Sequence, residues 1–315
     1  MKTEILRDID RASEMLKEGG LVAIPTETVY GLAANAMNPN AVANIFTVKG
    51  RPQDNPLIVH VAHTDWLDAI VKYAPPIART LTDAFWPGPL TLIFPASDSV
   101  PRVVTAGLDT VAVRCPNHSM TQRLLETSGL YLAAPSANIS GKPSPTTARH
   151  VFDDLNGKIP AILDGGACGV GVESTVLDLT SEKPQILRHG GITRRDLEKF
   201  TELSDDKLPD APKAPGMKYR HYAPSAPLKI LRGGVPDEGV VLCPEEQRVL
   251  FAGGKLDVIV YGELANPETL NRGLFDALRR ADAMNKPIFA LCPGGEGFEA
   301  LRDRLYKAAG YLEEG

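Results

Sequence analysis

The chain has 315 residues, of which 43% are hydrophobic and 23% are charged, and its net charge is −5. This is the balance of an ordinary globular protein with room for two domains, so neither a metal nor disulfides are needed to hold its core. The acidic balance gives no support to a protein that coats nucleic acid, although it leaves room for a small basic pocket.

The first 205 residues predict many strands and fewer helices. Apolar residues at helical spacing predict a helix over 4–18, and Asn38 followed by Pro39 predicts the start of another. Strands are expected at LVAIP (21–25), PLIVHV, PLTLIFPA, VAVRCP, LYLAAPS, PAILDGG, STVLDL and QILRHG, and further helices at 75–85, 118–128, 145–156 and 192–200, the last capped by Thr193. Because both hairpins and crossovers are required, we expect an α/β domain on a twisted, mixed sheet.

A proline-rich stretch then interrupts the pattern and predicts a linker at 206–226. After it, strands at LKIL, VVLC, DVIVYG and PIFALC alternate with helical patterns over 266–284 and 296–312. Strands that alternate with helices predict a small Rossmann-like three-layer domain over 227–315. CPGGEG, before the last helix, could bind a small anion or could simply be a tight turn.

The four cysteines give no sign of a metal or redox site. They are Cys115, Cys168, Cys243 and Cys292, and they form no CxxC pair. A reducing cytoplasm is therefore the expected location. The opening MKTEILRDID is too polar for a signal peptide, and no apolar run reaches the length of a membrane span.

Two dense polar stretches follow predicted strands near the start of the chain. PTETVYGL (25–32) places hydroxyls and a carboxylate where the first strand ends. In KGRPQDNPLIVH (49–60), Lys49 and Arg51 would point to the same side of an extended segment and could clamp a polyphosphate. A solvated basic turn is the alternative, and His60 taken alone could equally be a packed or surface histidine.

Two further stretches resemble known phosphate motifs but depart from them. SANISGKPSPTT (136–147) has Ser136 and Pro143 where a P-loop requires glycine and Ser/Thr, so a turn is the alternative. In VRCPNHSMTQR (113–123) the spacing from cysteine to arginine is too long for a phosphatase loop, which leaves Arg114 as the candidate for binding an anion. No motif for covalent catalysis is present. The cations, hydroxyls and amides in these loops suit a site that binds a polyphosphate and a small polar molecule side by side.

Five motifs in order carry a family resemblance: PTETVYGL, KGRP followed by NPLIVH, SANISG, ESTVLDL and PGMKYRHYAP. Together they resemble the YrdC-type threonylcarbamoyl-AMP synthases, and the linker and last domain are similar to the long form of that family. The resemblance implies that L-threonine, bicarbonate and ATP, with Mg²⁺, yield threonylcarbamoyl-AMP and pyrophosphate. It also implies that the product passes to a tRNA threonylcarbamoyl-transferase complex, which modifies the adenosine next to the anticodon, with no membrane association and no strong direct nucleic-acid binding.

The resemblance further implies which residues form the site. Its threonine-binding positions fall on Thr28, His60, Arg114, Ala134 and Ser174. Its nucleotide-binding positions fall on Arg51, Asn55, Thr110, Ser136, Ser144, Arg188 and Tyr222, and its catalytic tetrad falls on Lys49, Arg51, Ser136 and Asn138. The guanidinium of Arg114 could donate two parallel hydrogen bonds to the threonine carboxylate, while Lys49 and Arg51 would offset charge on the α-phosphate. Glu27 could orient these cations or cap a helix that begins near Val29.

Two other functions remain open at this point. A non-enzymatic RNA-binding module could use the same basic pocket, although the net charge argues against it. A different carbamoyl transferase, active in metal-centre maturation, would be expected to carry zinc-finger cysteines or an acylphosphatase-like domain. For residues 206–226 we expect a lid over the nucleotide, with Tyr222 in contact with ATP, while a passive tether is the alternative.

Overall fold

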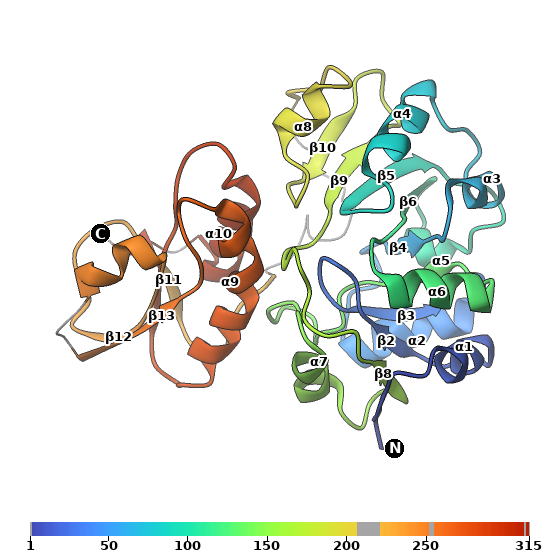
Figure 1. Cartoon of the computed structure of the whole chain (residues 1–315). Coiled ribbons are helices and arrows are strands. Elements are labelled where there is room, and N and C mark those ends of the chain that lie inside the picture. Colours follow the sequence, from blue (N-terminus) through green and yellow to red (C-terminus); the bar gives the residue numbers. More distant parts are fainter. Residues whose placement is uncertain (1, 207–220, 252–254, 312, 315) are drawn as a thin grey trace.

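Two β-sheets organise the protein (Figure 1). The computed structural model describes residues 2–206, 221–251, 255–311 and 313–314. The larger sheet has ten strands in the spatial order β1 (Glu4–Leu6), β8 (Ala161–Leu163), β2 (Val22–Ile24), β3 (Gly31–Asn35), β7 (Leu132–Ala133), β4 (Ile58–His60), β6 (Thr110–Arg114), β5 (Leu90–Pro95), β9 (Thr175–Asp178) and β10 (Gln185–Arg188). It is mixed, because β4 and β6 run parallel whereas β2 and β3 form an antiparallel hairpin. The predicted mixed sheet is therefore confirmed.

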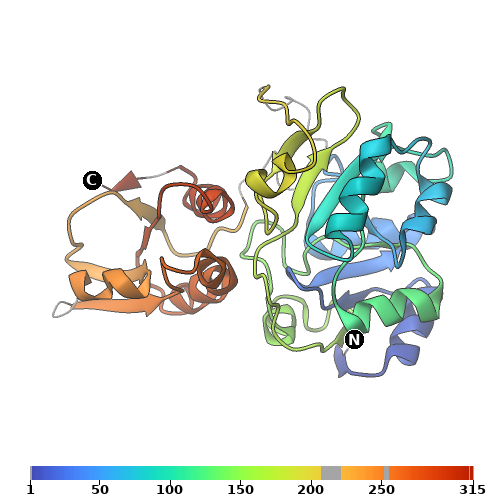
Figure 2. The same cartoon turned by 45° about the horizontal axis from the view of Figure 1, so that its top comes forward.

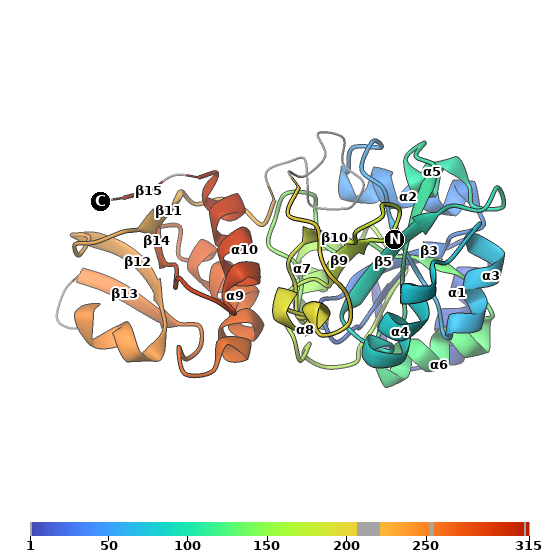
Figure 3. The ribbon, with the colours of Figure 1, turned by 90° about the horizontal axis from the view of Figure 1, so that it is seen from above.

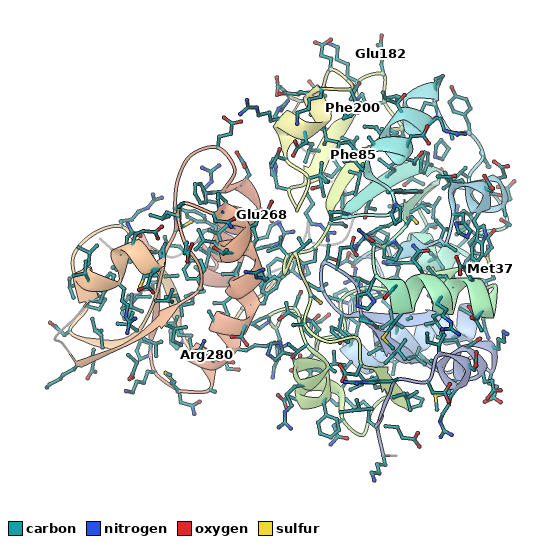
Figure 4. All side chains as sticks on the ribbon, viewed as in Figure 1. Met37, Phe85, Glu182, Phe200, Glu268 and Arg280 are labelled. Carbon is teal, nitrogen blue, oxygen red and sulfur yellow. The ribbon has the colours of Figure 1, made fainter. Side chains whose placement is uncertain are left out.

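Short helices connect these strands. They are α1 (Ile9–Lys17), α2 (Pro39–Lys49), α3 (Leu67–Ile70), α4 (Pro76–Phe85), α5 (Arg102–Thr105), α6 (Ser119–Ser128), α7 (Ala148–Leu155) and α8 (Arg194–Glu198), with a 3₁₀ turn η1 (Thr64–Trp66). The predicted caps are confirmed: the Asn38 side chain accepts from the first turn of α2, and Thr193 forms a capping box with Asp196. After α8, Phe200 packs edge-to-face on Phe85 of α4, with ring centroids 5.3 Å apart (Figure 4).

The two faces of the central strands differ in chemistry. On β5, Leu90, Leu92 and Phe94 join the main core with α2 and α4, so the alternating Thr91 and Ile93 face the other side. Helices α1 and α6 cover that other face over β8, β2, β3 and β7. Their apolar cover reaches Leu132 of β7, which lies in register with His60 on β4. Beyond β7 the same face carries the polar side chains of His60, Arg114 and Thr91 beside a small apolar cluster that includes Ile58 and Ile93, and the cavity described below lies there.

The smaller sheet belongs to a C-terminal unit, by which we mean the elements from β11 onward. Its strands are all parallel, in the order β13 (Lys255–Val260), β12 (Glu238–Cys243), β14 (Ile288–Leu291), β11 (Leu228–Leu231) and β15 (Glu313–Glu314). One face packs on α9 (Pro267–Asp282) and α10 (Glu299–Ala309), and the other packs on the 3₁₀ helix η2 (Glu245–Phe251). The predicted three layers are thus present, with η2 in place of an α-helix on one side.

Helices α9 and α10 stand between the two sheets (Figures 2 and 3). They share an apolar cluster with Val29 and Val172, two residues from loops beside the larger sheet. Arg279 of α9 adds an ion pair with Asp154 of α7, at 2.8 Å between Nη2 and Oδ2. Within the described ranges, none of the helices combines the length and the apolarity needed to cross a bilayer.

Two predictions near the N-terminus are wrong. Residues 4–18 are not one helix: residues 4–6 form β1, which pairs with β8, and α1 begins only after Asp8 caps it. No helix begins near Val29 either, because residues 31–35 form β3 between β2 and β7. In both cases long-range strand pairing overrides the local pattern. PTETVY is therefore the loop of a β-hairpin.

Candidate active site

A cavity lies where the helical cover of the larger sheet ends. Its walls are loops that follow or precede strands, and its floor includes Ile58 and His60 of β4 and Arg114 of β6. The lining comprises Thr26, Thr28, Val29, Gly31, Arg51, Ile58, His60, Arg114, Ala134, Pro135, Ser136, Asn138, Lys142, Ser144, Glu173, Ser174, Arg188, His221 and Tyr222. Segments far apart in sequence therefore meet at one concave, polar surface, which is the usual character of a small-molecule site.

The hairpin loop 25–30 forms one wall through hydrogen bonds of its own. The Thr26 hydroxyl accepts from the backbone N–H of Thr28 and of Val29 and donates to the Val29 carbonyl at 2.6 Å. This turn leaves the Thr28 hydroxyl beside that of Thr26, at 2.8 Å, and facing Arg114. The crowding of small hydroxyls after β2 thus builds a rigid polar wall.

Arg114 is the central cation of the floor. It donates through Nη1 to the Thr28 hydroxyl at 2.8 Å and through Nε to the Gly88 carbonyl at 3.2 Å. Its Nη2 lies 2.7 Å from Oε1 of Glu27, and both side chains are largely buried. That contact lacks the angle of a hydrogen bond, so Nη2 and both Glu27 oxygens keep unused hydrogen-bonding capacity. Glu27 therefore orients a cation, one of its two expected roles.

His60 lies beside Arg114 on the neighbouring strand, in register with it. It is 3% exposed, and burial, with a further contribution from the charge of Arg114, lowers its pKa to about 3. The imidazole is therefore neutral at physiological pH and can exchange hydrogen bonds without adding charge. Its Nδ1 has no hydrogen-bond partner in the described part of the chain, as expected of a group that meets a ligand.

Ser174 is held by two neighbours at the start of β9. Its hydroxyl lies 2.7 Å from the Thr91 hydroxyl and accepts from Nη2 of Arg188 at 3.0 Å. The backbone at Gly190 passes so close that a Cβ there would lie 2.2 Å from the Thr175 nitrogen. These contacts hold the Ser174 hydroxyl in place at the wall of the cavity.

On the threonine-binding role that the resemblance implies for Ser174, replacing Thr91 with valine should weaken threonine binding without altering the fold. Thr91 is fully buried, and valine keeps its shape but removes the hydroxyl partner of Ser174. We expect the KM for threonine to rise about 2- to 12-fold, the worth of one ordinary hydrogen bond, with the KM for ATP unchanged. Thr105→Val, at a buried threonine on α5 outside the cavity, is the matched control. An equal effect of both substitutions in steady-state kinetics would contradict this role.

Lys49 stands behind the cavity wall rather than in it. At the end of α2 it is 2% exposed, and its Nζ donates to the backbone carbonyls of Ser136 and Asn138. Burial, and secondly the charge of Arg51, hold the pKa of Lys49 well below its ordinary value. Lys49 therefore holds in place the loop that begins at Ser136. Unlike Lys49, Ser136 and Asn138 of that loop line the cavity.

Arg51 and Arg188 place two further guanidinium groups in the lining. Arg51 donates to the carbonyls of Asn55 and Pro56, and burial, followed by the charge of Arg188, lowers its pKa to about 10. Arg188 donates to the carbonyl and hydroxyl of Ser174. Because these cations destabilise one another, an anion bound between them would be favoured.

Most of the expected site residues meet at this cavity. Those in its lining are Thr28, Arg51, His60, Arg114, Ala134, Ser136, Asn138, Ser144, Ser174, Arg188 and Tyr222. Lys49 and Asn55 lie behind it, Asn55 as a backbone acceptor for Arg51. Thr110 does not reach it, because it begins β6, opposite Pro95, whereas Arg114 ends that strand. The assignment of Thr110 to the nucleotide remains a prediction without support from the cavity.

Sequence reasoning missed several members of the site. Lys142 lies in the P-loop-like stretch 136–147 without a role predicted from the sequence, and Thr26 and His221 likewise carry no prediction, although all three line the cavity. Glu173 was also missed, although ESTVLDL contains it. Its carboxylate accepts from the Ser144 hydroxyl and lies 2.8 Å from Nε of Arg304, a residue of α10. No sequence pattern links positions 173 and 304.

Comparisons with known proteins agree with this geometry. Residues 14–190 match the Sua5/YciO/YrdC family model, described as telomere recombination, and residues 192–310 match a model described as the C-terminal domain of threonylcarbamoyl-AMP synthase. The threonylcarbamoyl-AMP synthase of Pyrococcus abyssi is 47% identical, covering 95% of this chain and 93% of the relative. The threonylcarbamoyl-AMP synthase of Bacillus subtilis is 46% identical, covering 96% of this chain and 93% of the relative.

A solved structure matches the whole fold. It is P. abyssi Sua5 complexed with L-threonine, which superposes with a TM-score of 0.90 at 42% identity and covers 100% of both chains. Both sheets and their connections are therefore shared with that protein. The chain belongs to the Sua5/YrdC family of threonylcarbamoyl-AMP synthases.

Proposed function

We propose that the protein is an L-threonylcarbamoyl-AMP synthase, an enzyme that converts L-threonine, bicarbonate and ATP to threonylcarbamoyl-AMP and pyrophosphate. The observation that carries this proposal is the convergence of Arg51, Arg114 and Arg188 with hydroxyls and a neutral histidine in one cavity. The names of the curated relatives, and the threonine bound by the P. abyssi protein, support it. The RNA-binding alternative is not favoured, because those relatives are enzymes over nearly the same length.

The threonine subsite would lie on the Arg114 side of the cavity. Arg114 and the hydroxyls of Thr28 and Ser174 offer donors to a carboxylate and partners to a hydroxyl. Neutral His60 adds a partner without repelling the amine, and the backbone at Ala134 completes the floor. The threonine amine would combine with bicarbonate to give a carbamate and water, and the cavity would hold that carbamate facing the nucleotide.

The nucleotide would occupy the side that holds Arg51, Arg188 and Ser144. A carbamate oxygen would attack the α-phosphorus, and the bond from that phosphorus to the bridging oxygen would break, so that pyrophosphate leaves. Arg51, together with the loop from Ser136 to Asn138 that Lys49 anchors, would offset the charge that builds on the α-phosphate. The residues named here act by charge and orientation, with no covalent enzyme intermediate.

Magnesium would arrive with ATP and supply charge neutralisation at the phosphates. Two of the described carboxylates beside the cavity face a cation already: Glu27 lies against Arg114 and Glu173 against Arg304. The residues present therefore fit an ion that is held mainly by phosphate oxygens and water, as Mg²⁺ commonly is with nucleotides. Passage of the product to a tRNA-modifying transferase is part of the same proposal.

The boundaries 1–205, 206–226 and 227–315 remain our proposal for the domains. The predicted lid falls largely on residues 207–220, which lie outside the described residues. Its described end supports a place over the nucleotide, because His221 and Tyr222 line the cavity. Tyr222 has a positive φ of 64° and packs on Phe275 of α9, with ring centroids 5.3 Å apart.

The proposal is tested by following pyrophosphate release. The purified protein is incubated with ATP, Mg²⁺, bicarbonate and L-threonine, with controls that omit threonine or bicarbonate. We expect release that requires both. Release that ignores bicarbonate would indicate a plain amino-acid adenylating or ATP-hydrolysing activity. An absence of release would leave only the fold shared with the family.

A further inference from the structure

Arg304 of the C-terminal unit approaches the cavity from outside it. The residue lies on α10 and its side chain is fully buried. Its Nε donates to Oε2 of Glu173 at 2.8 Å, and its guanidinium lies over the ring of Tyr222, 5.5 Å from the centroid. Glu173 and Tyr222 both line the cavity, so one side chain of the C-terminal unit contacts two parts of the site.

Glu173 links the contact with Arg304 to the side of the cavity where the nucleotide would bind. Its other oxygen accepts from the hydroxyl of Ser144, and it is followed in sequence by Ser174. Burial alone would raise the pKa of Glu173, but the charges of Arg304 and Arg188 hold that pKa below its ordinary value. A charged carboxylate thus stands at a cavity that would bind an anion, and it repels that anion unless a cation offsets it.

We infer that Arg304 is a positioning residue for the nucleotide, an inference that rests on the proposed function. Arg304 also pairs through Nη1 with Asp303 at 2.6 Å, but Lys307 shares that carboxylate. Arg304 can therefore neutralise Glu173, which keeps the charge of Arg188 available to phosphate and leaves Glu173 free to hold Ser144. Stability alone is a poor explanation for Arg304: its Nη2 is buried without a hydrogen-bond partner in the described ranges, and a buried ion pair is often no more stabilising than apolar packing. The C-terminal unit would therefore set the electrostatics of a site that it does not line.

Three variants separate this role from simple docking of the C-terminal unit. Arg304→Met keeps bulk and removes the charge, and Arg304→Met with Glu173→Gln also removes the charge that needs neutralising while retaining an acceptor for Ser144. Arg279→Met is the matched control, because Arg279 joins α9 to Asp154 and the Pro143 carbonyl without contacting Glu173 or Tyr222. Each variant is assayed for pyrophosphate release, the KM for ATP and its melting temperature.

We expect Arg304→Met to raise the KM for ATP about 10- to 100-fold, and the double variant to return it to within about 3-fold of the parent. Arg279→Met should lower the melting temperature with a smaller effect on that KM. An unchanged KM in Arg304→Met, or a double variant no better than the single one, would overturn the inference while leaving the proposed function intact. Failure of the unsubstituted protein to release pyrophosphate would overturn both.

Discussion

Replacing Arg114 with alanine should reduce kcat/KM for threonine about 100-fold or more. Hydrogen bonds to a charged group are worth about 1.5–3 kcal/mol, or about 10- to 150-fold. The substitution has a second cost, because the largely buried Glu27 would lose the guanidinium that lies 2.7 Å from it and would repel the substrate carboxylate. Initial rates at saturating ATP over a range of threonine concentrations measure the effect.

The Glu27 side chain provides the control for this experiment. Arg114→Ala can also destabilise the fold, since it leaves a buried charge unpaired. In Arg114→Ala combined with Glu27→Gln that charge is gone, so the melting temperature should recover while threonine use stays impaired. If threonine use recovered with stability, Arg114 would be a structural residue and the threonine carboxylate would bind elsewhere.

Replacing Lys49 with methionine should lower kcat at least about 100-fold, the second large effect. The substitution leaves the carbonyls of Ser136 and Asn138 without their buried donor, and each unpaired buried group costs about 1–3 kcal/mol. We expect the loop that presents Ser136 and Asn138 to shift away from the α-phosphate, so that chemistry suffers more than binding. Single-turnover rates with saturating ATP and threonine separate the two.

Lys17→Met is the matched control for that substitution. Lys17 also donates to a backbone carbonyl, that of Thr127, but it does so at the protein surface, on α1. Lys17→Met should leave both kcat and the melting temperature unchanged. If Lys49→Met folded normally and kept its kcat, the position of this loop would not depend on Lys49 and the tetrad would lose one member.

Much of the fold could be predicted because its local signals are strong. Branched apolar runs marked β2, β4, β5 and β6, and Asn38 with Pro39 marked the start of α2. The strands β1 and β3 could not be predicted in the same way. Residues 4–6 become a strand only because β8, more than 150 positions later, pairs with them, and residues 31–35 lie between two strands that are separated in sequence.

The same distinction applies to the site. The motifs identified the polar loops, and the resemblance assigned residues that the cavity brings together. The register of β4 and β6 places His60 beside Arg114, but the sequence contains no sign of this pairing. The contact between Glu173 and Arg304 was even less accessible, because it depends on how the C-terminal unit packs against the larger sheet. Thr110 remains a prediction from the resemblance alone, because it begins β6 whereas Arg114, which lines the cavity, ends that strand.

The hairpin loop 25–30 also connects two parts of the molecule mechanically. Val29 packs into the apolar cluster of α9 and α10, whereas the preceding Thr28 faces Arg114. One peptide bond thus separates a residue held by the C-terminal unit from a residue of the proposed threonine subsite. A rotation of that unit would move the loop and alter its contacts with threonine. Release of the substrate and movement of the C-terminal unit would therefore be coupled.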